Sequence, residues 1–179
     1  VKNCIFDQNG LADNTLGIDI STSIIHLLDS SIKVEGSTFT NNGGLVKELD
    51  ELDYSSMFAL DESKLTMDKC EFSNNGTYFI INDEDESEVH ISETKFLNNK
   101  SAVMCGNEDT TSDSFFNNCT FENNVSSDFA TFYNITTIMT FYNCSMGNST
   151  FNVKDRIKFV NDALTANAVL RVSALKKDG

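Results

Sequence analysis

Apolar residues recur along the chain with a long period. A six-residue motif built around a Phe or Met appears six times, and successive motifs are separated by 33, 33, 24, 25 and 25 residues. The anchors of these motifs are Phe6, Phe39, Phe72, Phe96, Phe121 and Met146. Repeats of about 20 to 50 residues are typical of solenoids, propellers and other arrays, in which each repeat packs on its neighbours.

The residues before each anchor predict two short strands. Positions seven, five, two and zero residues before the anchor tend to be apolar or small, which gives two stretches with one buried face each. The alternation breaks three residues before the anchor, at Asn3, Gly36, Lys69, Glu93, Asn118 and Asn143. Asn and Gly tolerate the left-handed backbone that a tight bend requires.

A third apolar stretch precedes each pair of strands. These stretches cover residues 24–28, 57–60, 78–81, 102–105 and 129–133. No helical period occurs inside the repeats. Three short strands per repeat, stacked in register, predict an all-β solenoid, a parallel β-helix of about six coils.

The motif assigns a structural role to two columns of residues. We expect the anchors Phe6, Phe39, Phe72, Phe96 and Phe121 to point inward and to stack about 4.8 Å apart along the axis. The Asn three residues after each anchor is expected to form a ladder whose amides donate and accept hydrogen bonds between coils. Its members are Asn9, Asn42, Asn75, Asn99 and Asn124, with Ser149 closing the series. A ligand role for this column is the alternative.

The F-x-x-N motif occurs in five repeats, and Gly43-Gly44-Leu45 follows one of them. This combination resembles the repeats of the chlamydial polymorphic membrane proteins and, more broadly, the right-handed, pectin-lyase-like β-helix proteins. The resemblance implies that the solenoid is right-handed. It leaves the function open, because β-helices serve as lyases, as adhesins and as purely structural proteins.

Composition narrows the range of partners. The 179 residues carry 13 Lys and Arg against 27 Asp and Glu, and the net charge of −14 argues against nucleic-acid binding. No apolar run is long enough for a membrane helix, so this segment is not expected to insert into a membrane.

The repeat pattern starts and stops abruptly, as expected for a segment of a longer chain. Residues 1–151 hold the repeats, and 152–179 are expected to be further β-coil or a C-terminal extension. In that extension a helix over 155–177 and strands at 157–160 and 168–173 both fit the pattern.

Acidic residues gather just before the strand that begins seven residues ahead of the anchor. They are Asp61-Glu62, Asp83-Glu84-Asp85-Glu86, Glu108-Asp109 and Asp113. In stacked coils these turns form one acidic edge. We expect either a solvated surface or a weak binding site for Ca²⁺, which prefers oxygen ligands.

A polysaccharide lyase or a glycoside hydrolase is the natural enzyme class for this fold. Lyases of this architecture pair acidic residues with a basic one, but Arg156 and Arg171 lie outside the repeats and the lysines share no column. His26 and His90 lie in different repeats and are expected to be ordinary strand residues. The sequence therefore predicts no catalytic residue, no cofactor and no dedicated metal site.

Four of the five cysteines share one position of the motif. Cys4, Cys70, Cys119 and Cys144 lie two residues before the anchor, where a small thiol fits an inward-facing position. Only Cys119 and Cys144 are on adjacent coils, and parallel side chains one coil apart are poorly aimed for a disulfide. We expect stacked free thiols, with a Cys119–Cys144 disulfide as the alternative.

Seven N-x-S/T sequons favour a secreted glycoprotein. Three of them, at Asn75, Asn99 and Asn124, coincide with the ladder and are expected to be bare, because a sugar there would empty a rung. The other four are expected to carry glycan in part: Asn118, Asn134, Asn143 and Asn148.

The most direct functional expectation is an extracellular or cell-surface structural or adhesive protein rather than an enzyme. A rigid rod of this kind spaces, displays or assembles, by self-association into filaments or by contact with other surface proteins or glycans. A carbohydrate-active enzyme and a glycan-binding module are the alternatives. Aligned Asp and Lys in a cleft would favour the enzyme, and a row of exposed aromatic side chains on one outer face would favour the glycan binder.

Overall fold

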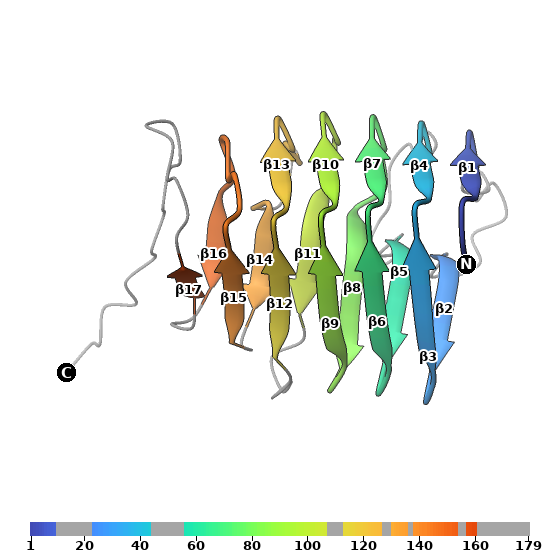
Figure 1. Ribbon diagram of the computed structural model, residues 1–179, viewed down its shortest axis with the longest axis horizontal. Coiled ribbons are helices and arrows are strands. Elements are labelled where there is room, and N and C mark those ends of the chain that lie inside the picture. Colours follow the sequence, from blue (N-terminus) through green and yellow to red (C-terminus); the bar gives the residue numbers. More distant parts are fainter. Residues whose placement is uncertain are drawn as a thin grey trace, which may run out of the picture.

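The computed structural model of the chain describes residues 1–9, 23–43, 56–106, 113–126, 130–135, 138–153 and 157–160. Within these residues the backbone forms seventeen short strands and no helix, and so contains no helix that could cross a membrane. The strands form three parallel sheets that run together along one axis (Figure 1). The predicted all-β parallel β-helix is confirmed.

Each sheet takes one strand from successive coils. Sheet B contains β1 (Ile5–Asp7), β4 (Thr38–Thr40), β7 (Glu71–Ser73), β10 (Lys95–Leu97) and β13 (Thr120–Glu122). Sheet C contains β2 (Ser23–Leu28), β5 (Ser56–Asp61), β8 (Phe79–Asp85), β11 (Ala102–Gly106), β14 (Phe132–Ile135) and β16 (Phe151–Val153). Sheet A contains β3 (Ser31–Glu35), β6 (Lys64–Asp68), β9 (Glu88–Ser92), β12 (Ser114–Asn117), β15 (Met139–Tyr142) and β17 (Ile157–Val160). A coil passes through sheets C, A and B in turn, as the three predicted strands per repeat require.

Equivalent residues of successive coils lie opposite one another. Phe72 pairs with Phe96 in sheet B, and Met67 pairs with Ile91 in sheet A. The sequence period is therefore the length of one coil. In sheet C the strand predicted over 78–81 is longer, since β8 extends to residue 85. The pairing of β5 with β8 shifts by one residue near the end of this strand.

Single residues with a left-handed backbone turn the chain from sheet A to sheet B. The position three residues before the anchor has φ between 46° and 56° in all six motifs. Gly36 is one of these residues, and a Cβ there would lie 2.6 Å from Asn3 Oδ1. Asp29 and Glu62, with φ of 48° and 46°, make the corresponding bend between sheets C and A. The predicted bend position is confirmed.

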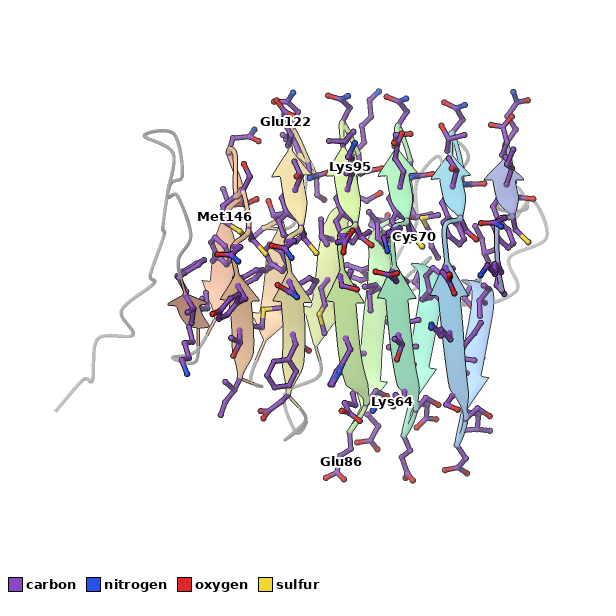
Figure 2. All side chains as sticks on the ribbon, in the orientation of Figure 1. Lys64, Cys70, Glu86, Lys95, Glu122 and Met146 are labelled. Carbon is purple, nitrogen blue, oxygen red and sulfur yellow. The ribbon has the colours of Figure 1, made fainter. Side chains whose placement is uncertain are left out.

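Phenylalanine rings fill the interior in columns. The five rings of the sheet B column are stacked nearly parallel, with centroids 4.5, 4.6, 5.0 and 5.1 Å apart from Phe6 to Phe121. A second column follows sheet A through Phe116, Phe141 and Phe159, at 5.0 and 5.4 Å. Rings of different columns meet edge to face, which suits the aromatic quadrupole. The side chains pack between the three sheets along the whole rod (Figure 2).

The outer faces of the sheets differ in exposure. In sheet C, Met57, Ile80 and Val103 alternate with the inward side chains and are still fully buried. The outer face of sheet A carries exposed charged groups, including an ion pair of 2.8 Å between Lys64 Nζ and Glu88 Oε2. Lys64 and Glu86 extend away from the rod at the strand ends (Figure 2). The outer face of sheet A is therefore more exposed at these positions than the outer face of sheet C.

The β-coil continues past residue 151. Strand β17 pairs in register with β15 and extends sheet A, so a helix spanning 155–177 is wrong for residues 157–160. The possible strand at 168–173 lies outside the described residues.

Candidate functional site

Each coil has three corners, and each corner carries a column of polar side chains. Where sheet B turns to sheet C, the asparagine corner consists of Asn9, Asn42, Asn75, Asn99 and Asn124. Where sheet A turns to sheet B, the thiol corner consists of Cys4, Ser37, Cys70, Thr94, Cys119 and Cys144. Where sheet C turns to sheet A, the acidic corner consists of Asp29, Asp61, Glu62, Asp85 and Glu86.

The asparagine corner is a continuous ladder of side-chain amides. Asn75 Oδ1 accepts hydrogen bonds from the backbone N and from Nδ2 of Asn42, both at 3.0 Å. Its Nδ2 donates to Asn99 Oδ1 at 2.8 Å and to the carbonyl oxygen of Phe39 at 3.0 Å. The same bonds join Asn9 to Asn42 and Asn99 to Asn124. The four members after Asn9 are at most 3% exposed, so their amides serve the fold rather than a ligand.

The ladder ends at Asn124, and the last motif is built differently. Ser149 is buried, but its N–H donates to Met146 O within its own turn at 2.9 Å. Asn148 Oδ1 instead accepts a hydrogen bond from the backbone N of Asn123 at 2.9 Å. Gly147 has φ of 51°, and a Cβ there would lie 2.4 Å from Phe121 O. The tight turn at this glycine replaces the expected closing rung at Ser149.

The thiol corner carries four thiols and the hydroxyls of Ser37 and Thr94, and all of its side chains after Cys4 are buried. Ser37 Oγ and Thr94 Oγ1 accept hydrogen bonds from the backbone N of Cys4 and Cys70, both at 3.2 Å. Burial raises the pKa of the Cys70 thiol. A hydrogen bond with Cys144 raises the pKa of Cys119, and burial adds to the effect. All five cysteines of the chain are free thiols, as expected. The Cys70 and Cys119 thiols therefore remain protonated, and burial keeps Cys70, Cys119 and Cys144 from reagents.

A serine column at the acidic corner was not predicted. Ser63 Oγ accepts a hydrogen bond from the backbone N of Ser30 at 3.0 Å, and Ser87 Oγ accepts one from the N of Ser63 at 2.9 Å. Each hydroxyl also donates to the carbonyl two residues earlier. These serines lie nine residues before the anchors Phe39, Phe72 and Phe96 in the sequence, a spacing that could have revealed them.

The acidic corner concentrates negative charge. Carboxylate oxygens of Asp61, Glu62 and Asp85 lie within 4.8 Å of one another. Repulsion from Asp29 and a carboxyl–carboxyl hydrogen bond with it raise the pKa of Glu62, and Asp85 and Asp61 add smaller repulsions. Three carboxylates at this spacing suit a hard cation, and the weak Ca²⁺ site at this edge stays a prediction.

Asp83 does not belong to the acidic corner, and its predicted place on the edge is wrong. It alternates with the inward Phe79 and Ile81 on β8 and is 1% exposed. Its Oδ1 accepts a hydrogen bond from the backbone N of Ser87 at 3.3 Å. Burial, with a contribution from the charge of Asp83, raises the pKa of Cys105 to about 12. Asp113 is exposed, whereas residues 108 and 109 and the side chain of residue 84 lie outside the described part of the chain.

The two histidines lie on different sheets, as expected for ordinary strand residues. His26 is exposed on β2 of sheet C. His90 lies on β9 of sheet A, with Nε2 2.6 Å from Glu88 Oε1, and its ring meets Phe115 edge to face at 5.0 Å. The two arginines lie outside the described residues.

The sequons divide by exposure. Asn118, Asn143 and Asn148 are exposed, and the side chain of Asn134 on β14 lies outside the described part of the chain. The ladder members Asn75, Asn99 and Asn124 use their Nδ2 atoms in buried hydrogen bonds. Because a glycan is attached through Nδ2, only the exposed group is free to carry one in the folded protein.

Comparison with known proteins gives one match. A family model described as a right handed beta helix region matches residues 1–151, which contain all six motifs. No curated protein and no solved structure matches the chain. The narrower resemblance to the chlamydial repeats stays a prediction.

Proposed function

Since the chain belongs to the right-handed β-helix family, we propose that it is a structural or adhesive rod of a cell surface or extracellular space. The observation that supports this is the uninterrupted repetition of side-chain columns from coil to coil, of which the asparagine ladder is the longest hydrogen-bonded one. Successive coils are joined through sheets C and A along the described rod, and through sheet B and the asparagine ladder as far as β13 and Asn124. A rod held this way keeps its length and presents its faces at fixed positions.

Self-association through the coil ends is part of the proposal. Strands β1 and β2 are the first members of their sheets, and in the described residues each pairs on one side only. Strand β3 is covered by residues 1–3, since Asn3 N–H donates to Glu35 O and Glu35 N–H donates to Val1 O, both at 2.9 Å. Ile5 on β1 and Leu28 on β2 are 77% and 60% exposed. Unpaired strand edges are templates for further pairing, and head-to-tail contacts between identical rods give filaments.

We favour this function over a carbohydrate-active enzyme. Glycosidases place two carboxyl groups about 5 to 9.5 Å apart across the scissile bond. Carboxylate oxygens of Asp61, Glu62 and Asp85 lie within 4.8 Å of one another, and repulsion from Asp29 raises the pKa of Glu62. His26 and His90 lie on different sheets. Within the described residues, Asp61, Glu62 and Asp85 form no ion pair with a Lys or His side chain.

The experiment is analytical ultracentrifugation over a range of protein concentrations, with electron microscopy of the concentrated samples. We expect concentration-dependent, end-to-end oligomers. The double variant Ile5→Lys, Leu28→Lys should suppress them, because charges on an edge strand oppose pairing. Val125→Lys, at another strongly exposed apolar position, is the control and should assemble normally. A monomer at all concentrations would count against assembly, and side-by-side aggregates would count against the coil ends as the contact.

The surface location carries its own test. If the protein passes through a glycosylating compartment, glycan is expected on some of Asn118, Asn134, Asn143 and Asn148 and on no ladder residue. Glycopeptide mass spectrometry of the secreted protein would decide. Sugar on Asn75 in folded protein would contradict the buried ladder bond from Asn75 Nδ2 to Phe39 O.

A further inference from the structure

The outer face of sheet A changes character along the axis. On the early strands β3 and β6 it carries the charged side chains of Lys33, Glu35, Lys64 and Asp68. On β12 and β15 the outward positions alternate with the fully buried Phe116 and Phe141. These four outward residues are uncharged and form what we call the aromatic patch: Phe115, Asn117, Thr140 and Tyr142. In a chain with a net charge of −14, such a face is a distinct surface.

The patch has a crossed arrangement set by strand register. Phe115 pairs with Thr140, and Asn117 pairs with Tyr142. The two aromatic rings therefore occupy one diagonal of a square, and the amide and hydroxyl groups occupy the other. Diagonal neighbours on adjacent strands are about 8 Å apart, so the rings would touch different units of an extended ligand.

The rings of the patch are accessible to a ligand. Phe115 is 39% exposed and Tyr142 is 44% exposed. His90 of β9 extends the aromatic surface on one side, with its ring 5.0 Å from that of Phe115. Lys158 of β17 lies beyond Thr140 on the other side and is exposed.

We propose that the aromatic patch binds an uncharged polysaccharide. A sugar ring has a face of C–H groups and a rim of hydroxyl groups. The C–H face suits the electron-rich faces of Phe115 and Tyr142, and the hydroxyls suit the Asn117 amide and the Thr140 hydroxyl. The net charge of −14 repels acidic polysaccharides and selects an uncharged ligand. This binding site is separate from the coil ends and does not depend on assembly of the rod.

A repeating ligand compensates for a small site. Two rings and two hydrogen-bonding groups give weak affinity for a single oligosaccharide. A long polysaccharide offers many copies of the same epitope, and rods that associate would bind it through several patches at once. The assay therefore uses polymers rather than short sugars.

Native affinity electrophoresis tests the proposal. The acidic chain migrates readily, and its retardation is measured in gels that contain galactomannan, mixed-linkage β-glucan, dextran or, as the acidic control, polygalacturonate. We expect retardation by at least one of the three neutral polymers and none by polygalacturonate. The double variant Phe115→Ala, Tyr142→Ala should lose at least about fivefold in affinity, because each ring contact contributes about 0.5 to 1.5 kcal/mol.

Two further variants keep the result interpretable. Val125→Ala removes an apolar side chain outside the patch that is more exposed than either ring, and this variant should bind normally. Tyr142→Trp preserves an aromatic ring and, since the chain has no Trp, gives a single tryptophan whose emission should change when the neutral polymer is added. The proposal is overturned if no neutral polymer retards the chain, if polygalacturonate alone does so, or if the folded double variant binds as well as the original protein.

Discussion

The substitution Asn75→Ala measures what the asparagine ladder contributes to stability. It removes four side-chain hydrogen bonds from a residue with no exposed surface: two accepted from Asn42 and one donated to each of Asn99 and Phe39. The backbone N–H of Asn42 and the carbonyl group of Phe39 lose these partners in the interior of the rod. Alanine offers neither a donor nor an acceptor in their place.

The expected loss follows from the number of buried groups affected. Each buried polar group left without a hydrogen bond costs about 1 to 3 kcal/mol. With the N–H of Asn42 and the carbonyl of Phe39 as the principal losses, we expect the free energy of unfolding to fall by about 3 to 5 kcal/mol. A domain has about 5 to 15 kcal/mol in total, so this single change should move the unfolding transition strongly.

Asn9→Ala is the matched control, because Asn9 is the exposed end of the same ladder. Its Nδ2 donates to Asn42 Oδ1 at 2.8 Å, but that oxygen also accepts a hydrogen bond from the backbone N of Asn9 at 3.1 Å. Its removal leaves no buried ladder atom without a partner. The expected loss is under about 1 kcal/mol.

Asn75→Asp adds a pH dependence to the same position. An ionised carboxylate cannot donate to Phe39 O or to Asn99 Oδ1, and burial opposes its charge, so the carboxyl pKa should be raised in the folded protein. The folded state then binds the proton more tightly than the unfolded state. Stability of this variant should therefore increase as the pH falls and decrease as the pH rises through the raised pKa.

Urea unfolding followed by circular dichroism provides the measurement, with the midpoint and the slope fitted separately. A lower midpoint at unchanged slope reports lost stability rather than a different unfolding process. If Asn75→Ala came within about 1 kcal/mol of Asn9→Ala, the amide ladder would contribute little and the reasoning from unsatisfied groups would be refuted.

The Phe column, the acidic corner and the thiol corner give three further tests. In urea unfolding, Phe96→Ala should lower the free energy of unfolding by about 3 to 5 kcal/mol. Phe96→Met should lower it by under about 2 kcal/mol, because Met fills much of the same volume and Met146 already serves as an anchor. Equal losses would contradict the role of filled volume. Asp29 raises the pKa of Glu62, so the folded state binds the proton of the Glu62 carboxyl more tightly than the unfolded state does. The original protein should therefore lose stability relative to Glu62→Gln as the pH rises above 4.5. Parallel profiles of stability against pH would speak against the repulsion. A coloured thiol reagent should modify the exposed Cys4 at once and the buried thiols of its corner only as the protein opens; immediate modification of all of them would show that the corner is not closed.

The columns of the interior could be predicted because each coil contributes one residue to each column, at the same position of the sequence motif. Phe39, Phe72 and Phe96 occupy the same place in successive motifs, and a period of one coil brings them into register whatever the details of the turns. The ladder asparagines follow for the same reason, since only Asn offers both a donor and an acceptor at that length. The prediction of a closing rung at Ser149 is wrong because the motif itself changes there, with a left-handed residue at Gly147.

Other features depend on geometry that the period does not determine. The acidic run 83–86 predicts that Asp83 lies on the edge, but β8 continues past Ile81, and its alternation places Asp83 inward, opposite Leu60. The serine column could not be predicted with the same certainty, because serine is common at turns of every kind. The aromatic patch depends on the pairing of Asn117 with Tyr142, which places residues of two coils on one diagonal.

The stacked arrangement of coils also determines how the rod responds to force. Because its strands lie across the axis, tension applied to the two ends of the chain peels one coil at a time instead of shearing all three sheets together. A coil of 24 residues occupies about 4.8 Å of the rod but contains about 80 Å of extended chain. Each detached coil thus lengthens the tether many times over and absorbs mechanical work, while the coils that remain keep their contacts. A stiff spacer built in this way can yield in small steps without losing its connection.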